Sequence, residues 1–204
     1  VAIGRLALYA QDPASAVEMH NTAVGYKAGA AVTTGIQNTL IGGLAGDAIT
    51  TGNYNSAVGY DSLGATTTGA NNTALGMTSL KSNTTGGQNV ALGLQTLYYN
   101  TTASNNTALG HVAMTFNTTG TQNVAVGADA LYTNTTASYN TAVGYQSLKL
   151  NTTGAQNVAV GTYALDANTT AANNTALGYA SLGANTTGDS SVAVGKDSML
   201  TNTT

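Results

Sequence analysis

The chain has 204 residues, only 6% of which are charged, and a formal net charge of −3. Soluble domains usually carry roughly 25% charged residues, so hydroxyl and amide groups must solvate this surface. Five basic residues are too few for the positive surface of a nucleic-acid-binding protein. The chain has no cysteine, which excludes disulfides and thiolate metal sites. No apolar run approaches the roughly 18 residues of a membrane span. From the few basic residues and the short apolar runs, we expect neither nucleic-acid binding nor insertion into a membrane.

The first twenty residues are irregular. Two phrase-closing glycines, Gly4 and Gly25, are 21 residues apart, whereas later ones recur every 17. We therefore expect residues 1–20 to form an atypical first coil with an inserted loop, as a cap or junction. Asp12, Glu18 and His20 lie in this stretch, but their spacing matches no zinc or calcium pattern. We expect a solvated loop there, with no metal and no cofactor.

From Asn21 onward a 17-residue unit repeats without a slip, so we expect residues 21–204 to form eleven structural units stacked on one another. Numbered from its Asn, the consensus unit is N-[TV]-A-[VL]-G-x-x-[SA]-L-x-x-N-T-T-G-x-[QN]. Positions 2 to 4 have strand patterning, and the glycine and the Asn/Thr/Gly cluster are turn signals. Two short strands and two turns per unit predict an all-β parallel β-solenoid. At about 4.8 Å per coil, it would be a rod roughly 50 Å long.

Two apolar columns are predicted inside the coil, because stacking places each position above its own copy. The first is position 4, a branched aliphatic residue in every unit, and the second is position 9, mostly Leu. The predicted core ladder is Val24, Val58, Leu75, Leu92, Leu109, Val126, Val143, Val160, Leu177 and Val194 at position 4, and Leu63, Leu80, Leu97, Leu131, Leu148, Leu165 and Leu182 at position 9. Alanine at position 3 points away from position 4, as either a tight core face or a flat surface for a neighbouring chain.

Polar residues also recur in register. Asn at positions 1 and 12 and Thr at positions 13 and 14 should form ladders whose side chains bond to their copies above and below. Position 12 opens the sequence NTT, an N-glycosylation acceptor where the source makes such glycans. The candidate acceptors are Asn83, Asn100, Asn117, Asn134, Asn151, Asn168, Asn185 and Asn202. The alternative, which we favour, is that NTT simply closes a turn of the solenoid.

No catalytic constellation is visible. The carboxylates Asp61, Asp129, Asp166, Asp189 and Asp197 fall at several repeat positions and do not form the facing pair that a glycosidase needs. We expect no catalytic residues and no enzyme. Thr-Thr ladders raise an ice-binding alternative, but neighbouring threonines of a strand point to opposite faces and T-x-T spacing is missing.

The phrases NTAVGYKA, NSAVGYDSL, NTAVGYQSL and NVAVGTYAL resemble the head repeats of trimeric autotransporter adhesins and the NTAVGYQ-type repeats of phage tail fibres. This resemblance implies a left-handed, trimeric β-roll that binds host receptors or other surfaces, outside the cell, at a cell surface or on a virion. The 17-residue unit is longer than the usual adhesin head repeat.

The sequence therefore predicts a non-catalytic structural or adhesive fibre segment, a shaft or head, whose partners are copies of itself and surface glycans. The alternative is a filament subunit that stacks end to end. The chain starts and stops within repeat phrases, so we expect a segment of a longer protein or such a subunit.

Overall fold

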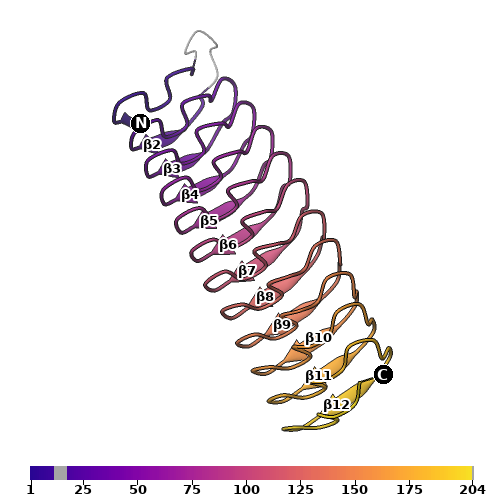
Figure 1. The fold of residues 1–204 in the computed structure, drawn as a ribbon. Coiled ribbons are helices and arrows are strands. Elements are labelled where there is room, and N and C mark those ends of the chain that lie inside the picture. The colour runs from indigo at the N-terminus through magenta and orange to yellow at the C-terminus, as the bar shows by residue number, and fades with distance from the viewer. Residues whose placement is uncertain (12–17, 204) are drawn as a thin grey trace.

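The computed structural model describes residues 1–11 and 18–203 as a stack of coils that forms one straight rod (Figure 1). Each coil contributes one short strand, and all twelve strands form one parallel sheet in sequence order, β1 to β12. The strands are β1 Ala2–Ile3, β2 Thr22–Val24, β3 Thr39–Ile41, β4 Ser56–Val58, β5 Thr73–Leu75, β6 Val90–Leu92, β7 Thr107–Leu109, β8 Val124–Val126, β9 Thr141–Val143, β10 Val158–Val160, β11 Thr175–Leu177 and β12 Val192–Val194. The predicted parallel β-solenoid of 17-residue coils is confirmed.

Strand register follows the repeat throughout. Ala125 of β8, for example, pairs with Ala108 and Ala142, its copies one unit before and one unit after. The first coil also stacks on the second, since Ala2 pairs with Ala23 and the Leu8 amide donates to the Ala28 carbonyl. Most of the insertion predicted for this coil, including Asp12, lies outside the described residues.

The glycine at position 5 follows each strand at a point where neighbouring coils approach closely. Gly59 has φ of 134°, and a Cβ placed on it would lie 2.6 Å from the carbonyl oxygen of Gly76 in the next coil. Both the backbone angle and the space therefore require glycine.

The predicted second strand of each coil is absent from the described coils. Positions 6 to 11 instead form a turn in which positions 7 and 9 have positive φ, as in Asp61 (55°) and Leu63 (53°). The Asp61 amide bonds back to the Gly43 carbonyl of the preceding coil, and the Leu63 amide bonds forward to Ser79 of the next. Backbone hydrogen bonding between coils therefore continues through a segment that is not extended. Leucine rarely adopts this conformation. The recurring leucine at position 9 therefore indicates a strand when the sequence is considered alone.

The core lies between the sheet and this turn, and it is narrow. Alanine at position 3 and Leu or Met at position 9 are fully or almost fully buried from the third to the tenth unit, which confirms the predicted column Leu63, Leu80, Leu97, Leu131, Leu148, Leu165 and Leu182. In the last unit Met199 is exposed. The first two units have Gly29 and Gly46 at position 9, and a Cβ on either would lie less than 3 Å from a methyl group of Leu40. Leu40, the exception at position 3, therefore fills the space that the missing leucines leave.

The predicted column at position 4 is wrong in its placement. These residues lie on the outer face of the sheet, exposed or half-buried: Val24, Val58, Leu75, Leu92, Leu109, Val126, Val143, Val160, Leu177 and Val194. Successive side chains of a strand point to opposite faces, and a narrow interior accommodates the alanine methyl at position 3. The larger side chain at position 4 is therefore directed outward.

Two asparagine ladders fill the rest of the interior. At position 1, the Asn123 amide N–H donates to Asn106 Oδ1 (3.0 Å) and its Nδ2 donates to the Ala137 carbonyl (2.8 Å). At position 12, Asn134 Nδ2 donates to Asn117 Oδ1 (2.8 Å) and to the same Ala137 carbonyl (3.0 Å). Among the described residues, no buried side-chain nitrogen or oxygen lacks a hydrogen-bond partner. The ladders therefore let a polar interior exist at little desolvation cost.

Candidate functional site: the outer sheet face and the aromatic groove

The most extensive candidate surface is the outer face of the sheet, formed by positions 2 and 4 of every coil. We call it the outer face. From Thr73 onward, position 2 alternates between Thr and Val in successive units, so Thr73 lies beside Val90 and Val90 beside Thr107. Threonine and valine therefore lie in one row of the outer face and do not form two separate faces. Position 4 adds a parallel row of Val, Leu and Ile, of which Leu75 and Leu177 are 47% exposed.

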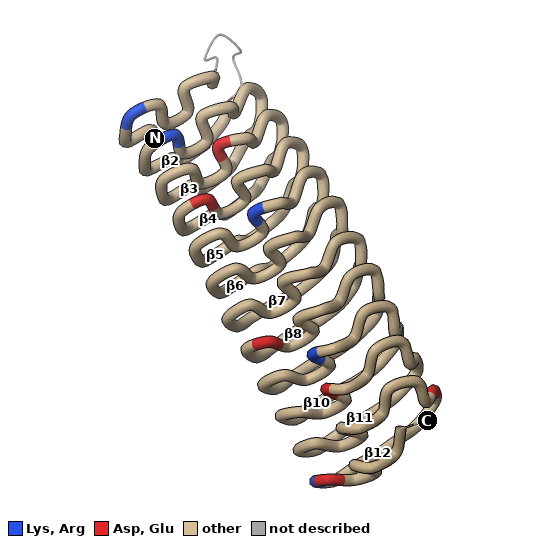
Figure 2. Tube along the Cα trace, viewed as in Figure 1, with Lys and Arg blue, Asp and Glu red and all other residues tan. Residues whose placement is uncertain are grey.

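The outer face carries no charge, because none of the twelve strands contains a charged residue. In Figure 2 the charged residues are scattered along the rod, most of them singly. A continuous, uncharged and largely aliphatic strip of this length is unusual on a monomer, whose largest apolar patch typically covers about 300–600 Å².

The seven candidate glycosylation sites from Asn83 to Asn185 are wrong as acceptors. Asn83, Asn100, Asn117, Asn134, Asn151, Asn168 and Asn185 are completely buried. Each donates its Nδ2 to the carbonyl three residues later, at 2.9 Å in Asn117, so the nitrogen that would carry a glycan is already engaged in the interior. Asn202, in the last coil, is half-buried.

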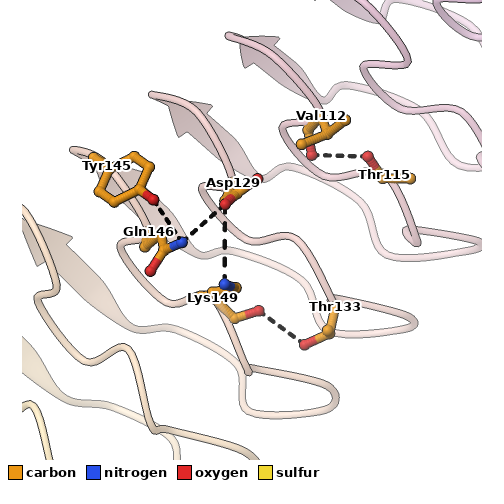
Figure 3. Close-up of polar contacts among 7 residues, drawn as sticks. All are labelled: Val112, Thr115, Asp129, Thr133, Tyr145, Gln146 and Lys149. Atoms are coloured by element: carbon orange, nitrogen blue, oxygen red, sulfur yellow. Dashed lines mark hydrogen bonds and ion pairs between the residues drawn. The ribbon is translucent and has the colours of Figure 1, made fainter.

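Half-buried polar side chains form small clusters that link neighbouring coils. Asp129 Oδ2 accepts from Gln146 Nε2 at 2.9 Å and faces Lys149 Nζ at 3.9 Å (Figure 3). Four coils earlier, the corresponding pair Asp61 and Lys81 is closer, at 2.9 Å. The hydrogen bond from Lys81 to Asp61 raises the pKa of the lysine. These contacts join one coil to the next.

Two carboxylates at position 10, Asp47 and Asp166, are partly desolvated. Partial burial raises the pKa of Asp166, and burial together with the nearby Asp61 charge raises that of Asp47. Near the first coil, Glu18 and His20 are 3.1 Å apart and exposed. No group of three or more His, Cys, Asp or Glu residues that could hold a metal ion occurs among the described residues.

A second candidate surface is an open groove of about 450 Å³ beside a run of aromatic rings, lined by Ser82, Tyr99, Thr101, Phe116, Thr118 and Thr135. We call it the aromatic groove. Tyr99 stacks on Phe116 with ring centroids 5.2 Å apart and planes 15° apart. Tyr98 and Tyr132 extend the run through edge-to-face contacts.

We did not predict a role for these aromatic residues from the sequence, although a signal was present. Tyr99 and Phe116 occupy position 11, which carries Ala, Ser, Thr or Leu in the other nine units. Two consecutive aromatic residues at a position of otherwise smaller side chains mark a local departure from the repeat. Such departures are where a repeat scaffold acquires a specific surface.

No helix in the described part of the chain is long and apolar enough to cross a membrane. Comparison with known proteins adds no identification, because no protein-family model, curated protein or solved structure matches the chain.

Proposed function

We propose that the chain is a non-catalytic structural segment of an extracellular fibre, a shaft or head on a cell surface or virion, built from several copies of the same chain. The observation that carries this proposal is the outer face. It runs along the whole sheet, presents aliphatic side chains to solvent and contains no charge that a second copy would have to neutralise.

The size of the outer face suits a stable contact between copies. Twelve strands at about 4.8 Å spacing give a strip roughly 50 Å long. With two outward rows and their flanking side chains, its width is on the order of 15 Å, so its area is about 800 Å². A typical stable interface buries about 800 Å² on each partner. Covering the strip would also remove the exposed edges of Val, Leu and Ile from water.

Cysteine cross-linking tests this contact, and the natural chain offers a background free of cysteine. Val126→Cys places a thiol in the middle of the outer face, and Thr119→Cys places one on another exposed row as the matched control. We expect Val126→Cys to form disulfide-linked oligomers on oxidation at protein concentrations at which Thr119→Cys does not. Sedimentation of the unmodified chain should give one discrete mass, with a trimer corresponding to the repeat class that the sequence resembles.

The same measurements separate the alternatives. A mass that grows with concentration, without cross-linking through Val126, would favour the filament subunit that stacks end to end. A monomer at all concentrations, with equal and slow cross-linking of both variants, would refute the packing of outer faces.

An adhesive role would be multivalent, because identical rows repeat a weak contact many times along a stiff rod. Surface glycans or host-surface receptors are the proposed targets. We expect beads coated with the chain to be retained on a polysaccharide surface from which single soluble chains dissociate. Equal retention of coated and uncoated beads would contradict adhesion.

Ice binding is a second candidate, and one observation favours it. The hydroxyls of the Thr-Thr pairs are not a free array, since position 13 donates to the next coil, as Thr118 Oγ1 does to the Thr135 carbonyl (3.0 Å). The outer face nevertheless presents Thr at position 2 beside Val or Leu at position 4, a flat and regular array. Thermal hysteresis of the monomeric chain would support ice binding, and its absence would exclude it.

A further inference from the structure

The aromatic groove lies in the middle of the rod and follows its axis. Its first wall consists of position 11 in successive coils, Ser82, Tyr99 and Phe116, and its second wall consists of Thr101, Thr118 and Thr135 at position 13. The lining therefore spans four coils, or roughly 14 Å of rod, which is long enough for a short linear ligand.

The walls of the groove are apolar although half of its residues are threonines. Thr101 Oγ1 donates to the Thr118 carbonyl (3.1 Å), and Thr135 Oγ1 donates to the Thr152 carbonyl (3.1 Å). Because these hydroxyls bond to the neighbouring coil, the threonine methyl groups are what remains to line the groove. Tyr99 and Phe116 are 45% and 37% exposed, so much of each ring is open to contact.

The stacked rings leave part of their faces uncovered. Parallel rings in contact lie about 3.5–4.0 Å apart, whereas the centroids of Tyr99 and Phe116 are 5.2 Å apart. The two rings must therefore be slipped relative to each other by roughly 3.5 Å. The uncovered part of an aromatic face carries negative charge density and attracts polarised C–H groups.

The surroundings of the groove select a ligand that is polar but uncharged. None of the lining residues carries an amine, guanidinium or carboxylate group. Beside the threonine wall, position 14 supplies a row of exposed hydroxyls from Thr102, Thr119 and Thr136. A charged ligand would find no partner in this lining, whereas a ligand with its own hydroxyls would find donors and acceptors along the rim.

The open shape of the groove decides between a sugar and a hydrocarbon chain. A hydrocarbon chain gains free energy in proportion to the area removed from water, and an open groove would leave much of it hydrated. A sugar ring presents one C–H-rich face to an aromatic surface, and its outward hydroxyls remain favourably hydrated. The groove therefore suits the sugar.

We propose that the aromatic groove binds a short, neutral oligosaccharide, with C–H groups on Tyr99 and Phe116 and hydroxyls on the threonine rim. This rests on the proposed adhesive function and gives it a specific contact site.

Calorimetric titration with maltohexaose, cellohexaose and chitohexaose tests the proposal, with intrinsic tyrosine fluorescence as a second signal. We expect at least one of these sugars to bind with a dissociation constant in the millimolar range or tighter. Tyr99→Ala and Phe116→Ala should each weaken binding about fivefold, since an aromatic contact contributes about 1 kcal/mol. Tyr139→Ala, which removes an exposed tyrosine outside the groove, should leave the affinity unchanged.

Three results would overturn the proposal: no binding of any of the three sugars, equal affinity of the groove variants and the natural chain, or stronger binding of dodecanoate than of the sugars at the same site. Denaturation midpoints of both groove variants show whether they remain folded. Cross-linking and sugar binding are both measured on Val126→Cys with the aromatic groove intact, which keeps the two proposals distinct. If Val126→Cys cross-links but no sugar binds, only the groove proposal fails. If a sugar binds but no cross-linking occurs, only the packing of outer faces is contradicted.

Discussion

Replacing one asparagine of the position 1 ladder should destabilise the rod by about 2–4 kcal/mol, and Asn123→Ala is the variant that shows this best. Asn123 is completely buried, and its Oδ1 accepts the backbone N–H of Asn140 at 2.9 Å. The described structure gives that N–H no other acceptor. A buried donor left without a partner costs about 1–3 kcal/mol.

The lost donor contributes a smaller amount. Asn123 Nδ2 bonds to the Ala137 carbonyl, but Asn134 Nδ2 bonds to it as well, so this carbonyl keeps one partner. We assign about 1 kcal/mol to this bond, and the two contributions together give the predicted range. Asn106 Oδ1 is also retained as an acceptor, because it still receives the backbone N–H of residue 123.

Denaturant unfolding followed by circular dichroism measures the change in free energy of unfolding. Repeat arrays do not always unfold in a single cooperative step, so hydrogen exchange at the Asn140 amide provides a local measurement. Gln122→Ala, which removes an exposed neighbouring side chain, is the matched control and should change stability by less than about 0.5 kcal/mol. The reasoning would be refuted if Asn123→Ala unfolded at the same midpoint as this control and the Asn140 amide stayed protected.

Three further predictions concern other parts of the coil. Leu131→Ala should cost about 2–5 kcal/mol in the free energy of unfolding, because it leaves a cavity in a core that is one leucine wide; a loss below 1 kcal/mol would contradict the assigned core. Val112→Asn should stabilise the chain by about 0.5–1 kcal/mol, because a β-branched residue is strained at φ of 51° and asparagine tolerates that region. A lower denaturation midpoint for this variant would contradict the prediction. The pKa of Asp166 is raised in the folded chain by burial, so its ionisation opposes folding above its unfolded pKa. Asp166→Asn should therefore raise stability at pH 7, with the gain disappearing below about pH 4; a gain independent of pH would exclude this explanation.

The period, the solenoid and the polar ladders could be predicted from the sequence, but the inner and outer faces could not be assigned from hydrophobicity alone. Valine at position 4 is more apolar than alanine at position 3. Hydrophobicity alone therefore favours an interior position for the valine. The phase of the strand is set instead by Asn123 at position 1, whose side chain bonds to other coils in the interior. Strict alternation then places Val124 outside, Ala125 inside and Val126 outside. Recognising asparagine as an interior residue would have corrected the assignment.

The turn at positions 6 to 11 was beyond sequence reasoning for another reason. Leu63 and its counterparts adopt positive φ because hydrogen bonds to the coils above and below, together with burial of the side chain, outweigh the local preference of leucine. The only hint was that Gly29 and Gly46 occupy the same position in the first two units, with φ of 59° and 55°. The aromatic groove likewise depends on side chains of four coils meeting along the axis, which a single unit does not reveal.

The direction of the backbone hydrogen bonds gives the rod a particular response to tension. The strands run across the axis and the bonds between coils run along it, so coils under a pulling force are loaded in series, each through the same set of contacts. Separation of two coils would release 17 residues of chain, or roughly 50 Å of slack, while the remaining coils keep all their own contacts. A fibre built in this way would lengthen in steps and dissipate mechanical work before the covalent chain itself came under strain.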